Sequence, residues 1–262
     1  MSLTLGSGPL ASNPSGHFNF DLDGAPKHRI LFEDYQRRMR ALVGGHTVVD
    51  STRGKLLHES NIHAVYYAPI DDFDRDALVA SDHHTHCPFK GDASYWSLKV
   101  GDREVENAVW YYPEPLAESR WLDGYAALYW DKADLWLCED EPVRGHMRNP
   151  YHRVDVMESS RRVKVKVNGT TVAESDRPKM LFETGIPARA YLLRADVLPG
   201  ILERSQTTTH CPYKGNATYW HVRTPDGLAQ DAAWSYETPL PEAGKVMDHL
   251  SFAGDGVEVD LS

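Results

Sequence analysis

Two cysteines and two lysines stand at matching places in a segment that occurs twice in the chain. Cys87 precedes Lys90 in Thr-His-Cys-Pro-Phe-Lys-Gly, and Cys211 precedes Lys214 in Thr-His-Cys-Pro-Tyr-Lys-Gly. The thiolate is the nucleophilic form of cysteine, and a nearby cation lowers the pKa of a thiol. A turn lysine can contact an anion or form a Schiff base. These four residues are the candidate catalytic residues; the alternative is that the cysteines are buried and inert and the lysines solvated.

Other reactive or ligand-capable side chains recur at the same spacing. An arginine and a glutamate in each segment predict either a plain ion pair or a substrate-binding cation beside an acid–base group. The tyrosines either line a pocket with their hydroxyls or pack in the core with the hydroxyl exposed to solvent. The candidate ligand-binding residues are Arg53, Glu59, Tyr67, His86 and Tyr95 in the first segment, and Arg177, Glu183, Tyr191, His210 and Tyr219 in the second.

The histidine-rich stretch before Cys87 resembles a cluster of metal ligands. It reads His83-His84-Thr85-His86-Cys87, but the second segment reads Thr207-Thr208-Thr209-His210-Cys211. Only one histidine and one cysteine recur, and two ligands are too few for zinc. We therefore expect no metal site, and the sequence names no cofactor.

These paired residues belong to an internal duplication. Over the twelve residues from Thr85 to Trp96, nine are identical to the residues 124 positions later, and the same offset holds without a gap from about Arg37 to Leu137. Two copies are too few for a solenoid, so each copy should close its own core, or the two should pack as an intramolecular pseudo-dimer. The predicted divisions are an N-terminal arm (1–36), repeat 1 (37–138), a connector (139–160) and repeat 2 (161–262).

The elements that must position these residues are short strands. Residues 163–167 alternate valine with lysine, and Asn168-Gly169 and residues 170–174 complete a strand–turn–strand pattern. The repeat extends this hairpin to the first copy, where we expect a strand from about Arg38. Asp72 and Asp196 are predicted to cap a short helix ending near Ala80 and Arg204. The fold class expected is mainly β, with two homologous sandwich-like or barrel-like domains in tandem, each with a short helix.

The signature segment itself should form a strand end followed by a turn. The residue before a proline favours extended backbone, which places His86-Cys87 at the end of a strand. Residues 88–91 then read as a turn, and alternation from 93 to 100 predicts the next strand.

Composition bounds the class of protein. The chain has 262 residues, 41% of them hydrophobic, and a net charge of −10, which argues against a general nucleic-acid binder. No apolar run approaches the length that spans a membrane, and residues 1–15 lack a secretory signal pattern. Three cysteines without such a signal indicate free thiols in the cytoplasm, which disfavours a Cys87–Cys211 disulfide.

The repeated motif Thr-His-Cys-Pro-[Phe/Tyr]-Lys-Gly-x-Ala-x-Tyr-Trp, preceded by Ser-x-Arg and by a distal Glu and Tyr, resembles the DUF427 family, a domain of unknown function. The likeness covers both copies, and tandem copies occur in that family. The resemblance implies a mainly β domain. The family is named after nucleotidyltransferases, yet this supplies no catalytic residue to carry over.

Three functions stay open at this point. The clustering of reactive side chains at matched positions favours a small-molecule pocket in each copy, with catalysis as an extension. The lack of a diagnostic catalytic motif leaves a non-catalytic binding or interaction module. Nucleotidyl transfer is implied by the family name alone, and it would call on Asp50, Glu174, Glu59 and Glu183 to hold Mg²⁺.

Overall fold

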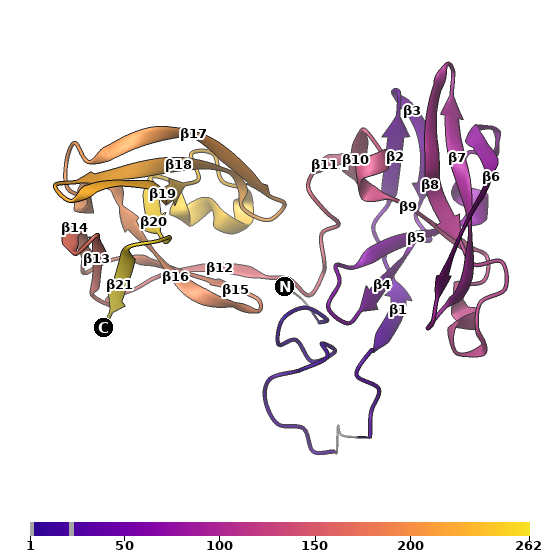
Figure 1. Cartoon of the computed structure of the whole chain (residues 1–262), viewed down its shortest axis with the longest axis horizontal. Coiled ribbons are helices and arrows are strands. Elements are labelled where there is room, and N and C mark those ends of the chain that lie inside the picture. The colour runs from indigo at the N-terminus through magenta and orange to yellow at the C-terminus, as the bar shows by residue number, and fades with distance from the viewer. Residues whose placement is uncertain (1–2, 21–23) are drawn as a thin grey trace. The chain divides into compact units, whose positions relative to one another are not determined.

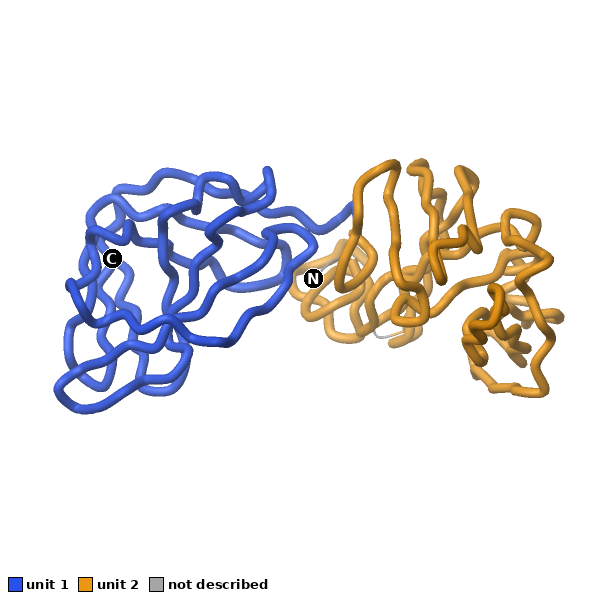
Figure 2. Tube along the Cα trace, turned by 90° about the horizontal axis from the view of Figure 1, so that it is seen from above, with its two compact units in different colours: residues 1–2, 150–262 blue, residues 3–149 orange. Residues whose placement is uncertain are grey.

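The computed structural model describes residues 3–20 and 24–262, and most of their regular structure is β-strand. The chain divides into two compact units, Leu3–Asn149 and Pro150–Ser262, which Figure 2 draws in orange and blue. Each unit holds one copy of the repeat and two antiparallel sheets. The predicted mainly β fold with two homologous domains is therefore confirmed.

The first unit contains a large sheet and a small one (Figure 1). The large sheet has the strand order β1-β4-β5-β9-β8-β7-β6, and the small sheet has the order β11-β10-β2-β3. Their bounds are β1 (Ile30–Asp34), β2 (Met39–Val43), β3 (His46–Ser51), β4 (Lys55–Glu59), β5 (Val65–Pro69), β6 (Leu78–Cys87), β7 (Gly91–Val100), β8 (Arg103–Tyr111), β9 (Tyr125–Leu128), β10 (Leu135–Cys138) and β11 (Glu141–Val143).

The second unit repeats the order of the large sheet, and its small sheet has three strands where the first unit has four. Its large sheet runs β12-β15-β16-β20-β19-β18-β17, and its small sheet runs β14-β13-β21. The bounds are β12 (Val154–Glu158), β13 (Val163–Val167), β14 (Thr170–Ser175), β15 (Lys179–Glu183), β16 (Ile186–Leu193), β17 (Leu202–Cys211), β18 (Gly215–Thr224), β19 (Gly227–Ser235), β20 (His249–Phe252) and β21 (Val257–Leu261).

The predicted hairpins form as expected. Strands β13 and β14 pair around Asn168 and Gly169, whose φ angles of 50° and 81° suit a tight hairpin turn. Strands β2 and β3 pair in the same way around Gly44 and Gly45, so the strand expected from about Arg38 is confirmed. The strand ending at Cys87, the turn after it and the strand beyond are also present, as β6, the turn and β7.

The helices expected to start at Asp72 and Asp196 do not form as predicted, because neither aspartate caps a helix and only a 3-10 turn lies between Asp72 and Ala80. Asp72 ends a three-residue 3-10 turn, η1 (Ile70–Asp72), and a second turn, η2 (Arg75–Ala77), leads directly into β6. In the second copy Asp196 ends η5 (Arg194–Asp196), and β17 follows. The physical reason is that the Asp72 carboxylate is engaged elsewhere: Ser51 Oγ donates to it at 2.6 Å, and Asp196 accepts from Ser175 Oγ at 2.7 Å.

Each large sheet has two packed faces. The inner face contacts the small sheet; in the first unit this core includes Met39, Leu56 and Leu98, all fully buried. The outer face carries a second apolar cluster that includes Leu57 and the turn residue Leu122, from η3 (Ala117–Leu122). In the second unit the outer face packs against η6 (Pro241–Val246). Both faces of strand β7 are therefore used, as alternation of side chains requires.

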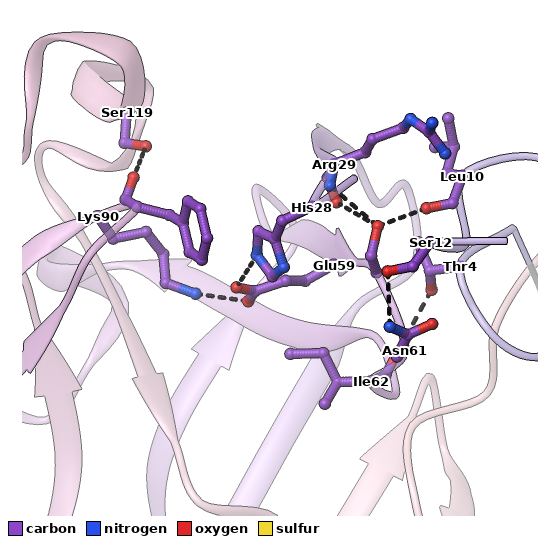
Figure 3. A network of polar contacts seen from close by, with 12 residues as sticks. Thr4, Leu10, Ser12, His28, Arg29, Glu59, Asn61, Ile62, Lys90 and Ser119 are labelled. Carbon is purple, nitrogen blue, oxygen red and sulfur yellow. Dashed lines mark hydrogen bonds and ion pairs between the residues drawn. The ribbon is translucent and has the colours of Figure 1, made fainter. Parts of the chain in front are cut away.

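Sheet residues also lie within the predicted arm and connector. Strand β1, from the predicted arm, pairs with β4 and is an edge strand of the first large sheet. Strand β12, from the predicted connector, pairs with β15 and is an edge strand of the second. Residues 4–12 contact the residues that follow β4: Thr4 Oγ1 donates to the Ile62 carbonyl at 3.3 Å, and Asn61 Nδ2 donates to Ser12 Oγ at 2.8 Å (Figure 3). Within the described residues, no helix has the length and apolarity to cross a membrane.

The turn of the signature segment depends on a glycine in each copy. Gly215 has φ +97°, and a Cβ there would lie 3.2 Å from the Thr238 carbonyl oxygen. We expect Gly215→Ala to lower the free energy of unfolding by about 1–3 kcal/mol in urea denaturation. Gly244→Ala is the matched control, because its Cβ meets nothing within 4 Å and its φ is not positive; it should change stability by less than about 1 kcal/mol. Equal effects of the two substitutions would contradict this reading of the turn.

Candidate functional site

The turn between β6 and β7 presents Lys90 to the interior of the first unit. Lys90 N–H donates to the Cys87 carbonyl at 3.2 Å, and the Lys90 carbonyl accepts from Leu116 N–H at 3.1 Å. Ser119 Oγ donates to the Phe89 carbonyl at 2.8 Å. The turn is thus tied to the segment that leads into η3, and the Lys90 side chain is directed inward rather than into solvent.

Lys90 forms a buried charge cluster with Glu59 and His28 (Figure 3). Lys90 Nζ lies 2.5 Å from one carboxylate oxygen of Glu59, and His28 Nε2 lies 2.7 Å from the other. The Lys90 and Glu59 side chains are buried, at 9% and 6% exposed, and the His28 side chain is half-buried, at 26%. The ring of Phe89 stacks on that of His28 with centroids 3.9 Å apart. A buried charge is costly unless it is paired. The Lys90 ammonium and the Glu59 carboxylate therefore stabilise each other inside the domain.

The second copy builds the same cluster from equivalent residues. Lys214 and His152 bind the two carboxylate oxygens of Glu183, His152 at 3.0 Å, and the ring of Tyr213 lies 4.1 Å from that of His152. The Lys214, Glu183 and His152 side chains are 6–12% exposed. The arrangement of lysine, glutamate, histidine and aromatic ring therefore recurs residue for residue; we call it the Lys–Glu–His cluster.

Burial and partners act in opposite directions on Glu183. Burial raises the pKa of its carboxyl, but the hydrogen bonds from His152 and Lys214, together with the charge of those two residues, lower the pKa to about 2. The carboxyl is therefore ionised at every physiological pH, and it holds its two partners in place as an anion.

The thiol and three tyrosines lie beside this cluster on the outer face. Tyr67, Tyr95 and Tyr112 are buried there, and the partly exposed Cys87 packs against them. Trp110 Nε1 donates to the Tyr67 hydroxyl at 3.0 Å. Burial raises the pKa of Tyr67 well above its ordinary value, and the nearby Tyr112, Glu59 and Cys87 raise it further. Tyr67 is consequently a protonated hydroxyl at neutral pH.

The second copy places Cys211 in the same setting. Tyr191, Tyr219 and Tyr236 surround it, and Trp234 Nε1 donates to the Tyr191 hydroxyl at 3.1 Å. Burial raises the pKa of Tyr236, and Tyr191, Cys211 and Glu183 add to the effect. Each copy thus gathers a thiol, a carboxylate, an ammonium and protonated phenols on one face.

Two of the predicted site residues in each copy do not join the cluster. Arg53 binds Asp72, which also accepts from Ser51, and this network pins the turn between β3 and β4. His86 is exposed and lies 2.6 Å from Asp92.

In the second copy, Arg177 lies 3.8 Å from Asp196 and His210 lies 2.7 Å from Asn216. Arg177 lines a separate open pocket of about 580 Å³, bounded by Arg162, Val163, Lys164, Glu174, Ser175, Asp176, Asp196, Asp260 and Ser262.

Four residues of the site, His28, His152, Tyr112 and Tyr236, were not among the residues predicted from the sequence. The signal for the histidines was present, because Pro26-Lys27-His28-Arg29 and Pro150-Tyr151-His152-Arg153 share the offset of 124. Both histidines precede the predicted repeats, which begin at Arg37 and Arg161, and each is followed by an edge strand, β1 or β12. Among residues 3–20 and 24–262, no group of three or more His, Cys, Asp or Glu side chains is arranged to hold a metal ion.

The lowered pKa of Glu183 makes its contribution to stability depend on pH. The folded-state pKa lies below the ordinary 4.5, so the stabilisation is fully present above about pH 4.5 and is lost as pH falls toward 2. We expect Glu183→Gln to lower the free energy of unfolding at pH 7 by about 3 kcal/mol, and the difference from the wild type to shrink in acid. Urea unfolding between pH 7 and pH 3 measures it.

The matched control is Glu174→Gln, since Glu174 is 61% exposed and pairs with Lys164 on the surface. It should cost at most about 1 kcal/mol, with little dependence on pH. A cost at Glu183 as small as that at Glu174 would show that the Lys–Glu–His cluster does not hold an ionised carboxylate.

The comparisons with known proteins agree with the duplication. The family model described as a domain of unknown function, DUF427, matches residues 31–139 and again residues 155–262. Both matched ranges begin within the edge strand of a large sheet. The chain matches no curated protein. Because the two matches cover most of the sequence, the chain belongs to the DUF427 family, as a tandem of two such domains.

Proposed function

We propose that each copy binds a small molecule on the outer face of its large sheet, beside the Lys–Glu–His cluster. The observation that carries this proposal is the recurrence of the cluster, with its thiol and three tyrosines, in both copies. Buried ion pairs are seldom better for stability than apolar residues of similar size. Both copies retain a buried ion pair next to a thiol. This retention favours a binding site over a purely structural role.

The chemistry of the site favours a ligand with hydrogen-bond acceptors. The buried tyrosines are protonated at neutral pH, because burial raises the pKa of Tyr112 and Tyr191 as it does that of Tyr67. Their hydroxyls are therefore donors for carbonyl or other oxygen atoms of a ligand. Cys87 and Cys211 are partly exposed next to these donors, and catalysis, if present, would use the sulfur as nucleophile and a tyrosine as proton donor.

Nucleotidyl transfer receives less support from the carboxylates. Glu59 and Glu183 already bind a lysine and a histidine. Asp50 lies on β3 of the small sheet and binds Arg38 at 2.5 Å, and Glu174 pairs with Lys164 at 2.8 Å. A non-catalytic binding module uses the same site as the small-molecule proposal and differs from it only in whether the thiol reacts.

A thermal-shift screen of the full chain against a metabolite panel tests the proposal. A ligand at 100 times its dissociation constant should stabilise its domain by about 2.7 kcal/mol. The shift should shrink in the double variant Tyr95→Phe, Tyr219→Phe, which removes one hydroxyl from each site. Tyr111→Phe is the matched control, because the Tyr111 ring stacks on Trp96, a residue packed against the inner-face core, and should leave the shift unchanged.

Labelling with iodoacetamide supplies an independent readout. A ligand from the screen should slow the alkylation of Cys87 and Cys211 as it occupies the site. A panel without hits, together with cysteines that stay unlabelled in the folded protein, would count against a small-molecule site in either copy.

A further inference from the structure

The two copies share the Lys–Glu–His cluster but differ in the residues around it. On the outer face of the first copy lie five apolar or aromatic residues, and the residues 124 positions later are mostly of another kind. The first set is Phe32, Val65, Trp121, Tyr125 and Tyr129; the second is Val156, Arg189, Lys245, His249 and Ala253. Two cations and a histidine thus replace one aliphatic and two aromatic side chains.

In the first copy these residues form an aromatic layer. Phe32 stacks on Trp121 at 5.0 Å and meets the edge of Tyr125 at 5.3 Å. Tyr129 packs on Trp110 at 4.4 Å, and its hydroxyl lies 3.4 Å from that of Tyr95. Burial and this hydrogen bond raise the pKa of Tyr129 to about 12, so the layer carries no charge at neutral pH.

In the second copy a guanidinium stands in this region. Arg189 lies two residues before Tyr191 on β16, so both side chains project from the same face. Its Cζ atom is 5.1 Å from the centroid of Trp234, the indole that donates to Tyr191. Among the described residues Arg189 has no ion pair. Its charge lowers the pKa of Tyr191, whereas Cys211 raises it. Arg189 is thus an exposed cation on the face of the sheet where Tyr191, Trp234 and Cys211 pack together.

A buried nitrogen on the same face also lacks a partner. His249 pairs with Leu193 across β20 and β16, which places it on the Tyr191 side of the sheet. The residue is 6% exposed; Nδ1 lies 2.7 Å from the Met247 carbonyl oxygen, while Nε2 has no hydrogen-bond partner within the described part of the chain. Unsatisfied buried polar atoms are uncommon in folded proteins and call for a ligand or a water.

We infer that the site of the second copy takes a small molecule carrying an anionic group, whereas that of the first takes a neutral or aromatic one. This inference rests on the proposed function. The Lys–Glu–His cluster is present in both copies, so it makes no difference in charge between the two sites. The same holds for the equivalent ion pairs Lys55–Asp34 and Lys179–Glu158. Arg189 and Lys245 are the cations that the second site adds. Arg189 is the one that contacts Trp234, the partner of Tyr191, and guanidinium suits carboxylate and phosphate geometry.

Two alkylating probes of nearly equal size, iodoacetate and iodoacetamide, test this charge preference. Each forms an S–C bond with a cysteine thiolate and releases iodide, but only iodoacetate carries a negative charge. Peptide mass spectrometry of the full chain gives the rate at Cys87 and at Cys211 separately. The ratio of the iodoacetate rate to the iodoacetamide rate should be roughly threefold to tenfold higher at Cys211 at low ionic strength, and the excess should fall with added salt.

Reciprocal variants assign the effect to Arg189. Arg189→Val should bring the Cys211 ratio down to that of Cys87, and Val65→Arg should raise the Cys87 ratio. Arg177→Val is the matched control, because Arg177 is an exposed arginine of the same copy that lies by Asp196. It should leave both ratios unchanged.

The outcomes separate the inference from the proposed function. Equal ratios at the two cysteines, or a Cys211 ratio that survives Arg189→Val, overturn the inference and leave the shared binding site standing. Cysteines that resist both reagents in the folded protein overturn the two together, because neither site would then admit a small molecule.

Discussion

The buried ion pair between lysine and glutamate is the contact on which the rest of each domain's site depends. Lys90 comes from the β6–β7 turn, Glu59 from the end of β4, and His28 from the residues that lead into β1. Three segments distant in sequence are thereby joined at one buried carboxylate. Once the ammonium is desolvated it must stay paired, so the turn cannot swing into solvent without exposing a costly unpaired charge. The position of Cys87 follows from that constraint.

The sheets supply the rigid frame for this contact. The inner face of the large sheet is filled by the small sheet, which leaves only the outer face for polar chemistry. There the tyrosines and the tryptophan hold one another by hydrogen bonds such as that from Trp110 to Tyr67. A strand presents alternate residues to opposite faces, so one strand can serve the core and the site at once.

The two copies share the Lys–Glu–His cluster but differ in the residues around it. The Lys–Glu–His cluster recurs with the same partners, whereas Val65 is matched by Arg189 and Tyr129 by Ala253. Substitution of one member of a buried ion pair is costly, because the other charge is left buried without a partner. Residues at the partly exposed rim carry no such penalty. The pattern of retention and change therefore follows the energetic cost of each position.

Local signals were enough for part of this protein. Alternation and the Asn168-Gly169 turn predicted the β13–β14 hairpin, the offset of 124 predicted two like domains, and the proline after Cys87 predicted a strand end. These features depend on backbone preferences and side-chain periodicity, which are properties of neighbouring residues. The same reasoning singled out Lys90 and Glu59 as residue types without showing that they meet.

Tertiary structure decided which of those residues act together. Asp72 resembled a helix cap, but Ser51 and Arg53 claim its carboxylate, so a 3-10 turn and a strand replace the helix. His28 stood in a segment that read as a loose arm, and pairing of β1 with β4 carries it to Glu59. The sequence by itself determined the duplication, the hairpins, and the lysine and glutamate of the cluster as candidate residues. The choice of partners was left to the fold, because sheet pairing brings together residues that no local pattern connects.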